Sequence, residues 1–214
     1  MHGPDALLLV SPACNYCKGM RQFLTEFANS NALASLAVVD ISEQPEIAEQ
    51  LGVRSVPWLL LGEFVFEGAH TPGEISKWID VSKQENGWPD YLAHLLATGQ
   101  LSLAERLVQD KPERVVALIE LARNAQTEMN IRIGIAAILE SQQGLQAVHE
   151  LIPLLADMAE SEQATIRADA CHFLALTGSA EAIPVLRKCI NDTDPSVREI
   201  ASEGIAELQA DPGD

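Results

Sequence analysis

Short apolar runs alternate with helical patterns through the first 85 residues. Turn residues bound four apolar runs, which predict buried strands at residues 6–10, 36–40, 58–61 and 64–66. Apolar residues at helical spacing predict helices from about residue 14 to 28, 45 to 51 and 72 to 82. The resulting order, β-α-β-α-β-β-α, predicts an α/β domain with two parallel strands, an antiparallel hairpin and helices that cover the sheet.

Two boundaries in this domain carry specific turn and capping signals. Gly62 and Glu63 join the last two runs, and a two-residue loop that begins with glycine is typical of a β-hairpin. Thr71 precedes Pro72 and stands three residues before Glu74, which is the pattern of a capping box with proline at the first helical position. The last helix of the domain is therefore expected to begin at Pro72.

From residue 90 onward no strand pattern returns, and a helical pattern repeats. Three apolar-arginine pairs recur at spacings of 35 and 31 residues, each at the start of an apolar helical stretch: Ile131-Arg132, Ile166-Arg167 and Val197-Arg198. Two apolar-proline pairs recur between them at a spacing of 31: Ile152-Pro153 and Ile183-Pro184. A period in this range is typical of stacked helical hairpins, each of which buries its apolar face against a neighbour.

The stretch Asp192-Thr193-Asp194-Pro195-Ser196-Val197-Arg198 resembles HEAT-type repeats, with Asp194 as the cap of a helix that begins at Pro195. The resemblance covers about residues 128–208. Residues 90–125 are more divergent and are interpreted as a degenerate first repeat. We therefore predict two domains, an α/β domain at 1–85 and an all-α, HEAT-like repeat domain at 86–214.

The charge of the chain narrows the classes of partner. The formal net charge is −17, and both halves are acidic, with 11 acidic against 5 basic residues up to residue 87 and 20 against 9 after it. Such a surface repels nucleic acids and anionic membranes, so neither is expected as a partner, whereas a protein partner is compatible with it. No apolar run reaches the length of a bilayer-spanning helix and no signal-peptide pattern is visible, so we expect a cytoplasmic protein.

The candidate chemistry lies in Cys14-Asn15-Tyr16-Cys17, between the first predicted strand and the first predicted helix. Two cysteines three residues apart at a helix start can close a small disulfide ring, and the first sulfur then lies at the positive end of the helix dipole. Lys18 and Arg21 add positive charge on the neighbouring helical surface. The same spacing also fits half of a zinc site or a coincidence, but next to a βαβ pattern a redox pair is the favoured interpretation.

A zinc site would need two further ligands. The other two cysteines, Cys171 and Cys189, fall on core positions of the helical repeats and are expected to be buried, inert thiols. The five histidines show no ligand spacing. No metal and no cofactor is therefore expected.

With strand, cysteine pair and helix in this order, residues 4–81 resemble the thioredoxin superfamily. Val56-Pro57 directly precedes the third predicted strand, where that superfamily carries a cis-proline opposite the cysteine pair, and Gly68 matches the glycine after its last strand. The resemblance implies that Cys14 and Cys17 are catalytic. It also implies that Val56, through its backbone, and Pro57 bind an extended segment of the substrate.

The sequence departs from the superfamily at several positions. Leu8 and Val38 stand where thioredoxins bury an aspartate and a lysine, so Cys17 is expected to deprotonate less readily. Ala13 replaces the tryptophan that precedes the first cysteine in thioredoxins. The pattern corresponds to the smaller, glutaredoxin-like core, yet Ala69-His70-Thr71 lacks the paired aspartates with which many glutaredoxins hold glutathione. The sequence therefore does not identify the electron donor.

The favoured function is a dithiol–disulfide oxidoreductase that uses the CxxC pair, with the repeats recruiting a protein client or redox partner. A second hypothesis is a redox-sensitive adaptor or chaperone-like holdase, in which the repeats carry the function and the cysteine pair modulates it. A third is a scaffold that binds a metal or a cluster through Cys14 at a dimer interface.

Overall fold

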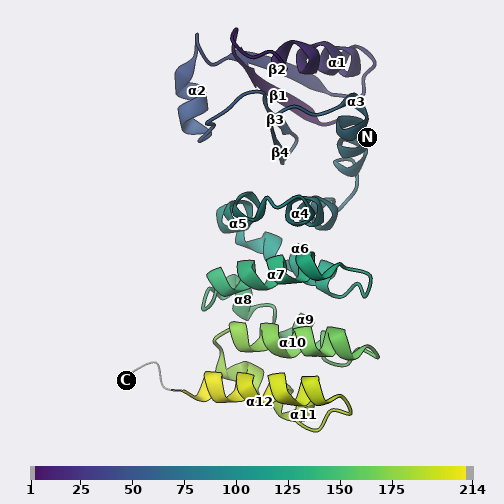
Figure 1. Ribbon diagram of the computed structural model, residues 1–214, viewed down its shortest axis with the longest axis vertical. Coiled ribbons are helices and arrows are strands. Elements are labelled where there is room, and N and C mark those ends of the chain that lie inside the picture. The colour runs from purple at the N-terminus through teal and green to yellow at the C-terminus, as the bar shows by residue number, and fades with distance from the viewer. Residues whose placement is uncertain (1–2, 211–214) are drawn as a thin grey trace. The chain divides into compact units, whose positions relative to one another are not determined.

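The computed structural model describes residues 3–210 (Figure 1), so the outermost residues of both predicted domains, 1–2 and 211–214, lie outside the described part. Contacts within the chain divide it into two compact units, Met1–Gly87 and Trp88–Asp214. The first contains a mixed sheet with helices, and the second is helical throughout its described residues. The predicted fold class, an α/β domain followed by an all-α repeat domain, is confirmed.

The sheet of the first unit has four strands in the order β2-β1-β3-β4. The strands are β1 (Asp5–Val10), β2 (Ser35–Asp40), β3 (Trp58–Leu61) and β4 (Phe64–Glu67). β1 pairs with β2 in parallel and with β3 antiparallel, and β3 and β4 form the expected hairpin, with Gly62 at a positive φ of 59° in its turn. The central strand β1 is apolar and its core side chains are fully buried, as the continuous apolar run predicted.

Three helices accompany this sheet: α1 (Cys17–Asn29), α2 (Pro45–Gln50) and α3 (Pro72–Val81). α1 packs against β2 and α3, and it buries Met20, Phe23 and Leu24 on one face. Thr71 caps α3 as predicted, because its hydroxyl accepts from the backbone N–H of Glu74 while the Glu74 carboxylate accepts from the backbone N–H of Thr71.

The prediction that a helix begins at about Cys14 is wrong. The backbone N–H of Cys14 donates to the carbonyl of Ser11 at 3.1 Å, which closes a turn directly after β1. Tyr16 is the N-cap and α1 begins at Cys17. The residues between the two cysteines therefore belong to the approach to the helix, and only the second cysteine lies in it.

The second unit is an array of helices without a strand in its described residues, 88–210. Its α-helices are α4 (Trp88–Ala97), α5 (Leu101–Asp110), α6 (Val115–Ala122), α7 (Met129–Ser141), α8 (Gln146–His149), α9 (Ile152–Met158), α10 (Ala164–Leu176), α11 (Ile183–Cys189) and α12 (Pro195–Gln209). Short 3₁₀ turns, η1 (Pro112–Arg114) and η2 (Ala180–Ala182), precede α6 and α11. α7, α10 and α12 pack one after another along the array (Figure 1), as a repeat of helical hairpins requires. Asp194 caps α12 and Pro195 is its first residue, as predicted.

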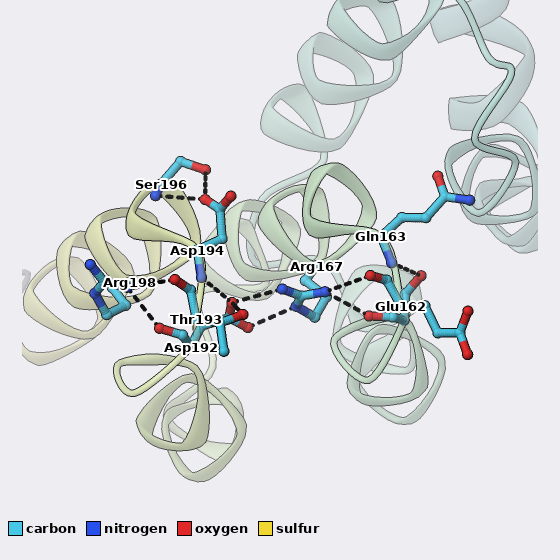
Figure 2. Close-up of polar contacts among 9 residues, drawn as sticks. Glu162, Gln163, Arg167, Asp192, Thr193, Asp194, Ser196 and Arg198 are labelled. Carbon is cyan, nitrogen blue, oxygen red and sulfur yellow. Dashed lines mark hydrogen bonds and ion pairs between the residues drawn. The ribbon is translucent and has the colours of Figure 1, made fainter.

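Three arginines repeat one role in this array. Arg132, Arg167 and Arg198 stand near the starts of α7, α10 and α12, and each donates to carbonyl oxygens of the loop before its own helix. Arg132 also pairs with Asp169 of α10, and Arg167 pairs with Asp192 in the loop between α11 and α12; Figure 2 shows the second pair. The arginines that mark the period in the sequence thus hold the loop before each helix, and two of them also pair with an aspartate further along the array.

Candidate functional site

The structure joins Cys14 and Cys17 in a disulfide, with their Cα atoms 5.4 Å apart. The two sulfurs differ in access. Cys17, the first residue of α1, is only 4% exposed, whereas Cys14 in the preceding turn is half-buried. Cys14 is therefore the sulfur that a molecule in solution reaches first.

The start of α1 stabilises a negative charge on the sulfur of Cys14. The backbone N–H of Cys17 donates to Sγ of Cys14 at 3.1 Å, so a helix N-terminus points at this sulfur. No acidic residue stands in the first turn of α1, and Lys18 and Arg21 are exposed on it. When the disulfide is reduced, these charges favour the thiolate of Cys14 over its thiol.

The structure brings Val56 and Pro57 to the same place. Sγ of Cys14 lies 3.6 Å from the carbonyl oxygen of Val56, and the Val56–Pro57 peptide bond is cis. The carbonyl of Pro57 accepts from the backbone N–H of Gly68, which fixes the segment before β3 to the end of β4. Within residues 3–210, neither the N–H nor the carbonyl of Val56 is hydrogen bonded to another backbone group, so both remain free to pair with an added strand.

A hollow of about 320 Å³ opens beside the disulfide. Lys18 and Arg21 line it together with Asp40, whose carboxylate accepts from the backbone N–H of Ser42 at 2.9 Å. Arg21 and Lys18 also line a second hollow further along α1. Two of the five basic residues of the first 87 thus stand beside the redox pair, in a domain that is otherwise acidic.

The departures from the superfamily pattern are visible in the sheet. Leu8 of β1 and Val38 of β2 are register partners, and Leu8 is fully buried. Neither position carries a group that could exchange a proton with Cys17. Among the described residues, no three histidine, cysteine, aspartate or glutamate side chains gather as a metal site would require.

Sequence reasoning missed one arrangement in the repeats. Arg167 of α10 donates two guanidinium nitrogens to the two carboxylate oxygens of Asp192, which lies in the loop after α11. The recurring apolar-arginine pairs were the available signal for this contact, because Arg167 belongs to one of them, but no spacing identifies Asp192 as its partner. Cys171 and Cys189 are both free and buried, as expected.

Two family models match the chain. Residues 6–80 match a thioredoxin domain and residues 115–206 match HEAT repeats. The chain therefore combines a thioredoxin-like domain with HEAT-type repeats, as both resemblances implied. The repeat match begins at residue 115, where α6 begins, and not at about residue 128 as expected. None of the curated proteins compared with the chain matches it. No helix among residues 3–210 is both long and apolar enough to cross a bilayer.

Proposed function

We propose that this protein is a dithiol–disulfide oxidoreductase whose helical repeats recruit a protein client. One observation carries the proposal: the more accessible sulfur, Sγ of Cys14, receives the first N–H of α1 and lies beside the free backbone of Val56. This arrangement offers a stabilised thiolate and a strand-binding edge at one point. The proposal assigns the chemistry to residues 1–85 and client binding to residues 86–214.

In the reducing direction, the Cys14 thiolate attacks one sulfur of the client disulfide. The client S–S bond breaks, the leaving sulfur takes up a proton, and a mixed disulfide joins Cys14 to the client. The Cys17 thiol then loses its proton and attacks Sγ of Cys14, which releases the second client thiol and closes the Cys14–Cys17 disulfide. Two electrons pass to the client, and a thiol or dithiol donor must return them for the next cycle.

Val56 and Pro57 are proposed to hold the client segment during this exchange. An extended segment that pairs with the free N–H and carbonyl of Val56 gains main-chain hydrogen bonds without a requirement on its side chains. Because Val56 lies against Cys14, pairing there brings a client disulfide to the attacking sulfur. This positioning raises the rate through orientation rather than through additional chemistry.

The repeats are proposed to select the client. HEAT repeats generally mediate protein–protein interactions, and a stack of hairpins offers an extended surface. The cytoplasm is proposed as the compartment. The need for a thiol donor that returns electrons to the Cys14–Cys17 disulfide supports it, because the cytoplasm maintains a pool of reduced thiols.

A second candidate function is a redox-sensitive adaptor or holdase. Met129 and Ile133, one turn apart on α7, are 66% and 63% exposed and offer an apolar contact that does not depend on the cysteine pair. In this case the oxidation state of Cys14 and Cys17 modulates binding by the repeats.

Single-turnover reduction of a small aromatic disulfide by the pre-reduced protein separates the two functions. The reductase predicts rapid release of the thiol product by the wild type, loss of this release in Cys14→Ser, and a stalled mixed disulfide in Cys17→Ser. If Cys14→Ser reacts as fast as the wild type, the reductase proposal is wrong and the adaptor remains.

A further inference from the structure

Strand β2 forms one edge of the sheet, with β1 as its neighbour on one side only. Its sequence, Ser-Leu-Ala-Val-Val-Asp, holds four apolar residues in a row and no lysine, arginine or proline. Its register with β1 is continuous over the whole strand, so no bulge interrupts it. Proteins protect an exposed edge with a lysine, a proline, a bulge or a covering element, because an open edge pairs with other strands. β2 carries none of the first three.

The backbone groups on the outer edge of β2 can be identified from one hydrogen bond. The N–H of Ile41, directly after β2, donates to the carbonyl of Val10 in β1 at 2.9 Å. Successive residues of a strand direct their N–H and C=O groups to opposite edges, so Ala37 also faces β1, whereas Leu36 and Val38 face away from it. Within residues 3–210, no backbone or side-chain group from a loop or helix is hydrogen bonded to this outer edge at Leu36 or Val38.

The N–H and C=O groups of Leu36 and Val38 are complementary to themselves. In an antiparallel pair, opposite residues at every second position exchange two hydrogen bonds. When two copies meet about a two-fold axis at Ala37, Leu36 of each copy stands opposite Val38 of the other, and every one of these groups finds a partner. The two Ala37 residues then face each other with Cα atoms about 4.5 Å apart, and their small, exposed side chains allow this approach.

The charges at the two ends of this edge also match in that arrangement. At the first end, the carboxylate of Asp5 accepts from the hydroxyl of Ser35 at 2.5 Å. At the other end, Lys18 and Arg21 outnumber Asp40 among the residues that line the hollow beside the disulfide. Antiparallel pairing brings the negative end of one copy to the positive end of the other. The two Asp40 residues lie about 20 Å apart along the paired strands, beyond the screening length of about 8 Å at physiological salt.

We propose that the outer edge of β2 is a docking surface for a second copy of this chain, and that antiparallel pairing of the two β2 strands joins two sheets into one continuous sheet. The proposal does not depend on the redox function proposed above. Because Asp40 at the end of β2 lines the hollow beside Cys14, the second copy borders that hollow. Pairing of two short strands buries little surface, so the dimer should dissociate on dilution.

Sedimentation equilibrium of the full chain tests the proposal, with protein concentrations from about 1 to about 200 µM. The average mass should rise with concentration from that of one chain toward that of two and should not exceed it, because a two-fold pairing uses both edges and closes the assembly. A mass that stays at one chain over this range would overturn the proposal.

Two variants at the axis test the pairing itself. Ala37→Lys and Ala37→Glu each place like charges directly opposite one another, so each variant alone should associate at least about tenfold more weakly than the wild type. An equal mixture of the two should recover the dimer, because a lysine then faces a glutamate. This recovery also shows that both variants are folded. Ser76→Lys, at an exposed position of α3, is the control for added charge and should associate like the wild type.

Amide hydrogen exchange locates the interface. The amides of Leu36 and Val38 should exchange more slowly at high protein concentration than at low, whereas that of Ala37, which faces β1, should be protected at both. If the protein associates without this change, or if the mixture of the two Ala37 variants stays monomeric, the chains do not pair through β2 and the proposal is wrong.

Discussion

The sulfur of Cys14 lies 3.6 Å from the carbonyl oxygen of Val56, although 42 residues separate them in the chain. The contact exists because β1 pairs with β3, so that the turn after one strand meets the segment before the other. A reactive sulfur and an unpaired backbone edge therefore share one surface.

The cations beside the disulfide should select substrates by charge. Lys18 and Arg21 line the hollow next to Cys14, so the wild type should reduce a small disulfide that carries carboxylates faster than one that carries ammonium groups. Lys18→Glu with Arg21→Glu should reverse this preference, by a factor on the order of ten at low salt. The measurement is the ratio of the two single-turnover rates. Lys77→Glu with Lys83→Glu changes the net charge equally, and an identical change of the ratio in that control would contradict the assignment.

A buried carboxylate in place of Leu8 should speed the attack of Cys17 on the mixed disulfide and lower the stability of the domain. Leu8 is fully buried opposite Val38, so Leu8→Asp should lower the free energy of unfolding by several kcal/mol. A proton acceptor on this face of the sheet should hasten deprotonation of Cys17 and resolution of the mixed disulfide. Leu9→Asp is the matched control, since Leu9 is equally buried but faces the other side of β1. Equal resolution rates in a folded Leu8→Asp variant and the wild type would exclude such a relay.

The Arg167–Asp192 pair should stabilise the repeats above pH 4. The hydrogen bonds from Arg167 lower the pKa of Asp192 from the usual 3.8 to about 2. The pair's contribution to the free energy of unfolding is therefore complete above pH 3.8 and is lost as the pH falls from 3.8 toward 2. Asp192→Asn should cost about 1.5–3 kcal/mol at neutral pH. The measurement is urea unfolding followed by circular dichroism at several pH values.

Asp157→Asn is the control for this variant. Asp157 pairs with Arg123 at 3.2 Å, but its side chain is 76% exposed, so its loss should cost about 1 kcal/mol or less. If both variants are destabilised equally, or if the Asp192→Asn difference does not shrink in acid, the pair between α10 and the loop after α11 is not the stabilising element.

Removing the array should separate chemistry from recruitment. A fragment of residues 1–85 keeps the whole sheet, both site cysteines and Val56, although a domain this small is only marginally stable. It should reduce a small disulfide at nearly the rate of the full chain and lose speed only toward the protein client, because the repeats contribute binding. A folded fragment that cannot reduce a small disulfide would show that the site is incomplete without the repeats.

The strand and helix order could be predicted because local residues mark it. The apolar run of β1, the glycine of the β3–β4 turn and the Thr71 capping box each act over a few residues, and each is found where the pattern indicated. The start of α1 was misplaced by three residues. Its position depends on the turn that Cys14 closes with Ser11, which leaves no signal in the apolar periodicity.

Contacts between elements were predictable only where a motif or a resemblance supplied them. The proximity of Cys14 to Val56 followed from the resemblance to thioredoxins and not from spacing. The ion pair between Arg167 and Asp192 arises from the packing of α10 near the loop after α11, and no local pattern in the sequence marks Asp192 as the partner of Arg167. A period shows that hairpins stack, but not which side chains meet between them.

The most direct test of the central claim is the alkylation rate of each cysteine in the fully reduced, full-length protein. Iodoacetamide is added at neutral pH, and mass spectrometry follows each cysteine over time. Because the N–H of Cys17 and the cations of α1 favour its thiolate, Cys14 should be modified first and about tenfold or more faster than a model thiol, while buried Cys17 lags behind. If Cys14 reacts no faster than the model thiol, or more slowly than Cys17, this account of the site is contradicted.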